Sequence, residues 1–165
     1  MDFSKHDART AAENPQPLKL RNPATGEYIT DGKDDQGNDK FCTVLVIGSH
    51  SRSVQAGILE DARKKLNNVK GKKKKDEASA LADVQKTLIE GAARVIRGFE
   101  NIEKDGKPLD PKNKDDVQWF LDLNFVSVKS LLASEKEQEE EWLGDSFAQQ
   151  ILKASNDASA YLGNE

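Results

Sequence analysis

Residues 41–47 form the stretch of sequence that most limits the possible folds. The stretch is rich in β-branched and aromatic residues and stops at Gly48, a combination typical of a strand. Because residues 44–47 are all apolar, we expect this strand to lie between neighbouring strands with a helix packed against it. Residues 18–20 and 28–30 are the candidate neighbours, since Asn-Pro and Thr-Gly turn signals separate them. A small antiparallel sheet is the expected result.

Two amphipathic helices are predicted after this strand. Apolar side chains from Val54 to Val69 share one arc of about 140° in helical geometry, which predicts a helix over 52–69 with Ser51 as its N-cap. A second helix is expected from Asp76, with an apolar face that continues to Phe99. Because the lysine-rich run 70–75 separates them, the two helices are expected to form an antiparallel hairpin.

Shorter elements are predicted in the second half of the chain. Asp105-Gly106 indicates a tight hairpin, and Asn113 is expected to cap a short helix. An apolar stripe then meets the acidic run 135–141, where a continuous core helix would have to bury unpaired carboxylates. We therefore expect the helix either to leave the core at this acidic run or to break before Trp142.

Apolar residues near the C-terminus recur at spacings of three and four, close to a coiled-coil seam. The acidic run separates this segment from the core, so we interpret it as a docking helix. Aromatic side chains at helical spacing are usually core, but Trp119 and Phe120 are neighbours and cannot both face inward on one helix. The candidate partner-binding residues are Trp119, Trp142, Leu143, Phe147, Ile151, Ala154, Ala158 and Tyr161.

These patterns predict one α+β domain, predominantly helical, with a small N-terminal antiparallel sheet and a C-terminal helix. Residues 1–17 carry little apolar periodicity and are expected to be a flexible arm. Residues 18–143 are expected to form the domain, and residues 144–165 a docking helix or flexible tail.

Composition excludes several classes of protein. Charged residues make up 33% of the chain and the net charge is −4, which does not favour general binding to nucleic acid. Cys42 is the only cysteine, so neither an intramolecular disulfide nor a cysteine cluster for zinc is possible. No apolar run of about 18 residues and no signal-peptide pattern occurs, so we expect a cytosolic protein without a membrane span.

Few residue patterns indicate catalysis. Ser49, His50 and Ser51 include a nucleophile and a base, which leaves a small hydrolase as a third possibility, but the sequence favours a helix-capping loop instead. The aspartates at 31–39 do not follow a calcium-loop pattern, and Gly48 lacks the phosphate-loop spacing. We therefore expect no catalytic residue, no cofactor and no metal.

Several segments in order resemble tail assembly chaperones of long-tailed (siphovirus-type) bacteriophages. The resemblance covers about residues 18–145. It includes the turn 21–27 (RNPATGE), the strand 41–47, the helix after Ser51, and the stretch 95–109 with its aromatic, acidic and Asp-Gly elements. A tryptophan is common in that family where Phe99 stands.

The resemblance implies a non-enzymatic protein in the cytoplasm of the infected bacterium, absent from the mature virion. Such a chaperone would bind and solubilise the tape measure protein and help to recruit tail tube subunits, in some phages through a longer frameshifted form. Homo-oligomers are possible, and no nucleic-acid or membrane partner is expected. The alternative is a structural tail or connector protein that stays in the virion.

Overall fold

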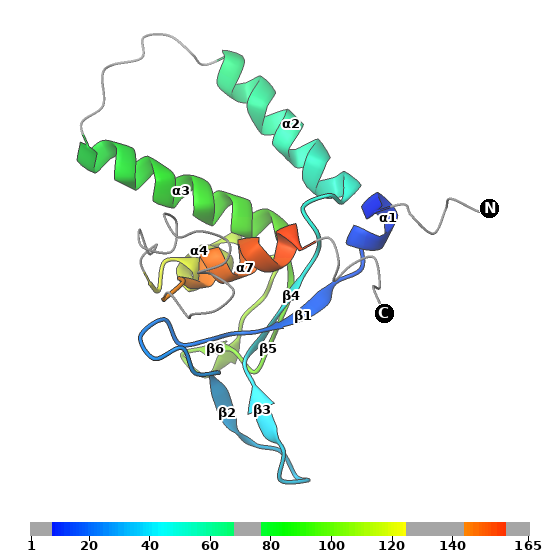
Figure 1. Ribbon diagram of the computed structural model, residues 1–165, viewed down its shortest axis with the longest axis vertical. Helices are drawn as coiled ribbons and strands as arrows, with labels where there is room; N and C mark the ends of the chain where they lie inside the picture. The colour runs from blue at the N-terminus through cyan, green and yellow to red at the C-terminus, as the bar shows by residue number, and fades with distance from the viewer. Residues whose placement is uncertain (1–7, 68–76, 125–143, 158–165) are drawn as a thin grey trace, which may run out of the picture.

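The sheet at the centre of the fold is three-stranded and antiparallel, in the order β1-β4-β5 (Figure 1). The central strand β4 (Thr43–Val46) pairs with β1 (Gln16–Lys19) on one side and with β5 (Ile96–Glu100) on the other. Val44 is fully buried. The prediction of a strand between neighbours at 41–47 is therefore confirmed for residues 43–46. The residues described by this computed structural model are 8–67, 77–124 and 144–157.

β5 occupies residues that the sequence pattern assigned to a helix. Helix α3 (Glu77–Val95) stops at Val95, and the chain enters β5 at the next residue. The prediction that the helix reaches Phe99 is wrong, because these residues instead complete the hydrogen bonding along β4. Gly98 permits this pairing, since a Cβ there would lie 2.8 Å from the Leu45 side chain.

Two short hairpins flank the sheet. Asp105 and Gly106, at φ of 52° and 78°, form the tight turn of the second hairpin, as predicted for an Asp-Gly pair. Residues 31–40, predicted to be a polar loop, instead form most of the first hairpin, which projects away from the helices (Figure 1). The strands are β2 (Thr30–Lys33), β3 (Asp39–Phe41), β6 (Glu103–Lys104) and β7 (Lys107–Pro108).

Helices α3, α4 (Lys114–Leu121) and α7 (Phe147–Asn156) lie together on one side of the sheet (Figure 1). Asn113 caps α4, as predicted, because its side chain accepts a hydrogen bond from the Asp115 amide. The core between these helices and the sheet is centred on Val44, Val46, Ala92, Phe120 and Ile151.

Helix α7 is joined to the N-terminal half of the chain. Gln150 donates from Nε2 to the Arg21 carbonyl and accepts at Oε1 from the Arg21 amide, at 2.9 Å each. The helix begins with a capping box formed by Ser146 and Gln149. Phe147 stacks on Phe120 with ring centroids 5.0 Å apart. α7 is therefore a core element, which corrects the prediction of a docking helix or flexible tail for this part of 144–165; residues 158–165 lie outside the described residues.

The N-terminal segment also differs from the expected flexible arm. Residues from Ala8 to Ala12 form helix α1, and β1 begins at Gln16. Ala12 is buried, and its carbonyl accepts a hydrogen bond from the Gly48 amide. Short-range periodicity could not reveal this, because the contact that orders the segment lies 36 residues further along the chain.

Helix α2 (Arg52–Asn67) begins beside α1 and diverges from α3 toward its far end (Figure 1). Arg94 of α3 forms an ion pair with Asp61 of α2. The fold is thus mixed α+β, as expected, while a predominance of helix over the whole chain stays a prediction. Within the described residues, no helix is both long enough and apolar enough to cross a bilayer.

Candidate functional site

The predicted partner-binding residues do not form one exposed surface. Phe147 and Ile151 are 8% and 0% exposed and belong to the core, so the prediction that they face a docking partner is wrong. Ala154 is half-buried on the same helix. The spacing that resembled a coiled-coil seam instead matches the contact of α7 with α3 and β4. The predicted residues outside the described chain are Trp142, Leu143, Ala158 and Tyr161.

Trp119 lies at the edge of the core. Its neighbour Phe120 is 1% exposed and fills the core, whereas Trp119 is half-buried and packs against the core from outside. The Lys104 ammonium lies 5.1 Å from the centroid of the Trp119 ring. The structure thus agrees with the prediction that only one of the two aromatic residues faces inward, and it leaves Trp119 partly exposed.

Ser51 acts as the N-cap of α2, as predicted. Its Oγ accepts a hydrogen bond from the Val54 amide at 3.3 Å, and the residue is fully buried. His50, in contrast, is exposed. The Ser51 hydroxyl therefore points into the start of the helix, where it satisfies an amide that would otherwise lack a partner.

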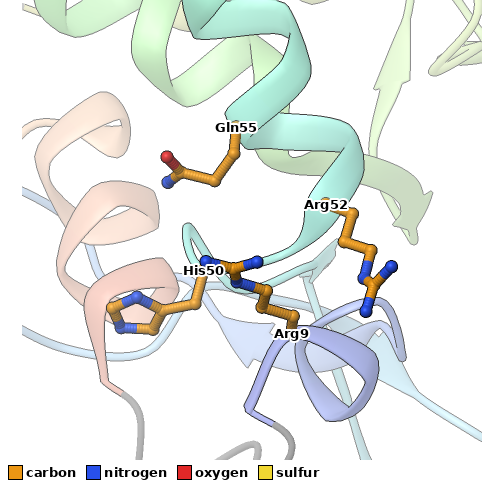
Figure 2. Close-up of a pocket in the computed structure, with 4 residues that line it drawn as sticks. All are labelled: Arg9, His50, Arg52 and Gln55. Carbon is orange, nitrogen blue, oxygen red and sulfur yellow. The ribbon is translucent and has the colours of Figure 1, made fainter.

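A hollow of about 520 Å³ lies beside this turn (Figure 2). Its described lining consists of Arg9 from α1, His50 from the turn, and Arg52 and Gln55 from the first turns of α2. All four residues are exposed. In Figure 2, Arg9 and Gln55 reach toward the space beside His50, whereas the guanidinium of Arg52 points to the other side. The side chains at the hollow are therefore mainly hydrogen-bond donors and cations.

Glu13 binds to the start of α2. Its carboxylate accepts from the Ser53 amide at 2.8 Å and from the Ser53 hydroxyl at 3.0 Å. These hydrogen bonds, first among them the one from the Ser53 amide, lower the pKa of Glu13, and the positive charge of Arg97 lowers it further. The start of α2 thus favours an anion, and this chain places one of its own carboxylates there.

Helices α2 and α3 carry exposed large apolar side chains. Ile58 and Leu59 on α2 are 42% and 54% exposed, and Val84 on α3 is 43% exposed. The far end of α2 diverges from α3 (Figure 1). We call Ile58, Leu59 and Val84 the α2–α3 apolar surface. All three belong to the apolar faces predicted for these two helices.

The acidic residues at 31–39 belong to the first hairpin, and two of them make contacts within it. Asp34 Oδ1 accepts from the Gln36 and Asn38 amides, and Asp31 pairs with Lys40 at 3.6 Å. Across the described ranges, no three His, Cys, Asp or Glu side chains converge as a metal site requires. Asp34 therefore forms the turn of this hairpin, and Asp31 takes part in an ion pair across it.

Cys42 is buried beside β5. Its Sγ donates a hydrogen bond to the Asn101 carbonyl at 3.2 Å. Burial raises the pKa of the thiol, and the negative charge of Asp31 raises it further. A buried thiol with a raised pKa is a poor nucleophile, so this cysteine serves packing.

Arg9 is one of the residues of the hollow that the sequence did not indicate. It lies in the segment predicted to be a flexible arm, 41 positions before His50. No local pattern links two such positions. The one available signal was the short ARTAA segment, whose alanines and arginine favour a helix.

Comparisons with models of protein families, with curated proteins and with solved structures found no match for this chain. Its function is therefore inferred from its residues and their geometry.

Proposed function

We propose that this chain is a tail assembly chaperone of a long-tailed bacteriophage, which binds and solubilises the tape measure protein and helps to recruit tail tube subunits. It works in the cytoplasm of the infected bacterium, catalyses no reaction and is absent from the finished virion. The α2–α3 apolar surface, formed by Ile58, Leu59 and Val84, is the observation that carries this proposal.

This surface has the chemistry of a docking site for an amphipathic helix. Exposed apolar side chains on neighbouring helices lose contact with water when a partner helix covers them, and this burial favours binding by about 25 cal/mol per Å². The surrounding polar faces carry charges such as Glu60 paired with Lys64. Charged rims of this kind keep a complex dissolved while its apolar centre is covered.

Because residues 18–145 resemble tail assembly chaperones, we propose the tape measure protein as the client. A tape measure protein is long and helical, and it therefore offers many amphipathic segments to such a surface. The α7 helix, which the sequence suggested as the docking element, has Phe147 and Ile151 in the core, so α2 and α3 take its place.

Co-expression with the tape measure protein of the same phage tests the proposal. Wild-type chain should keep that client in the soluble fraction and elute with it. The double variant Ile58→Ser and Leu59→Ser should retain the fold, because both side chains are largely exposed, but should lose most of this solubilising effect.

Lys64→Ser is the matched control, since it shortens another exposed side chain of α2 on the polar face. All variants should unfold at the urea midpoint of the wild type. Equal client solubility with wild type, double variant and control would exclude the α2–α3 apolar surface as the binding site. A stoichiometric band of this chain in purified virions would instead favour a structural tail or connector protein.

A further inference from the structure

The first turn of α2 is anchored in the domain, whereas the later turns are exposed. Val54 is 4% exposed, and the Glu13 carboxylate accepts hydrogen bonds from the amide and the hydroxyl of Ser53. From residue 58 to residue 64, every residue except Asp61 is exposed. Because packing provides most of the stability of a helix in a protein, the later part of α2 has weaker support than its start.

Gly57 stands between the anchored turn and the exposed part of α2. A glycine inside a helix weakens the helix relative to alanine, because glycine loses more backbone freedom when it is ordered. Packing does not require a glycine here, since no described atom outside the helix backbone lies within 4 Å of the place that a Cβ would take. Gly57 is therefore a weak point of the helix backbone. We call the part of α2 beyond it, residues 58–67, the α2 arm.

An ion pair links the α2 arm to α3. Asp61 of the arm pairs with Arg94 of α3, and the two side chains are 44% and 27% exposed. Both charges are thus partly shielded from water, which strengthens their attraction relative to a fully exposed pair. The arm diverges from α3 toward its far end (Figure 1). The ion pair therefore holds the arm near its base and fixes its direction relative to α3.

This contact also determines which way the apolar side chains of the arm face. At about 100° per residue, Ile58 lies about 60° and Leu59 about 160° around the helix from Asp61. When Asp61 faces α3, Leu59 therefore points away from α3, in agreement with its exposed fraction of 54%. An arm released from the ion pair would turn and bend at Gly57, and a partner would have to order it again at a cost in conformational entropy.

We propose that the α2 arm is hinged at Gly57 and that the Asp61–Arg94 ion pair holds it in the orientation that presents Leu59 to a client helix. Asp61 and Arg94 are positioning residues, because they lower the entropic cost of binding without touching the client. The role in client binding rests on the proposed function, whereas the hinge and its ion pair are properties of the chain alone.

Distances between spin labels on the arm and on α3, measured by pulsed electron paramagnetic resonance, test the hinge. The labels are attached to the full chain at Arg63→Cys and Thr87→Cys, two exposed positions, while the buried Cys42 stays unlabelled. The chain without further changes should give one narrow distance distribution. Asp61→Asn should broaden it, because the arm loses its ion pair. Adding Gly57→Ala should narrow it again, since alanine stiffens the helix.

Titration of a fluorescently labelled helical segment of the tape measure protein with the full chain tests the role in binding. Asp61→Asn should weaken the affinity about two- to fivefold, as expected for loss of a partly exposed ion pair. The exchanged pair, Asp61→Arg with Arg94→Asp, should restore both the narrow distance distribution and the affinity. Lys64→Gln is the matched control and should change neither, because it breaks an ion pair with Glu60 that lies within α2.

Four results separate the parts of the proposal. An unchanged distance distribution in Asp61→Asn would show that the ion pair does not hold the arm. A distribution that stays broad after Gly57→Ala would exclude the hinge. Broadening without loss of affinity would exclude a positioning role in client binding. Distances that respond as expected in a chain that does not bind the client would refute the proposed function and leave the hinge in place.

Urea unfolding of each variant shows whether an effect reflects loss of the fold. Arg94→Gln breaks the same ion pair from the side of α3 and should reproduce the broad distribution of Asp61→Asn. A narrow distribution in Arg94→Gln would contradict the assignment of the contact to this pair.

Discussion

Substitution of Ile151 by alanine tests whether α7 is part of the core. Ile151 is 0% exposed and lies in the cluster that joins α7 to the sheet and to α3. The change removes three carbon atoms, each worth about 0.8 kcal/mol of transfer free energy when buried. The remaining cavity adds a further cost, so we expect the free energy of unfolding to fall by about 3–4 kcal/mol.

Urea unfolding followed by far-ultraviolet circular dichroism measures this change. The midpoint should move to lower urea concentration with little change in the slope of the transition. Thermal unfolding should show a decrease in Tm of about 2–4 °C per kcal/mol for a chain of this size.

Leu59→Ala is the matched control, because Leu59 is 54% exposed on α2. It should change the free energy of unfolding by less than about 0.5 kcal/mol. The reasoning would be refuted if Ile151→Ala were as mild as this control. That result would mean that α7 has an unburied apolar face in solution, as the sequence pattern alone had suggested.

Three further changes probe local features. Glu13→Gln should lower the free energy of unfolding at neutral pH. The pKa of Glu13 lies below 4.5 in the folded protein, so the stabilisation by its charge is lost as the pH falls below 4.5. Acid unfolding curves of the wild type and the variant should therefore converge at low pH. Gly98→Ala should destabilise by about 1–3 kcal/mol in urea, since its methyl group would collide with Leu45; an unchanged midpoint would contradict the close packing of β4 and β5. Ser146→Ala should cost about 1 kcal/mol by removing the cap of α7, and the urea midpoint should fall accordingly.

The elements that could be predicted from sequence are those specified by adjacent residues. The strand at 41–47, the Asp105-Gly106 turn and the caps Ser51 and Asn113 each depend on a few neighbouring side chains. In each case one local preference, such as a β-branched run or a side-chain acceptor before a helix, agreed with the tertiary structure.

The failures occurred where distant residues decide the conformation. Helical periodicity continued to Phe99, but pairing with β4 converted its last residues into a strand. The spacing of Phe147 and Ile151 showed an apolar face without showing what covers it. Arg9 joined His50 at the hollow through a fold contact that no local pattern encodes.

The hydrogen bonds between Gln150 and the Arg21 backbone have a consequence for folding while the chain is being synthesised. The two partners are 129 positions apart, and α7 fills a space in the core that no earlier described segment occupies. A nascent chain therefore emerges from the ribosome with Val44 and Phe120 unshielded until α7 arrives. Ribosome-bound intermediates shorter than α7 should consequently be sensitive to protease and should recruit general folding factors, while release of the finished helix closes the domain in one late, cooperative step.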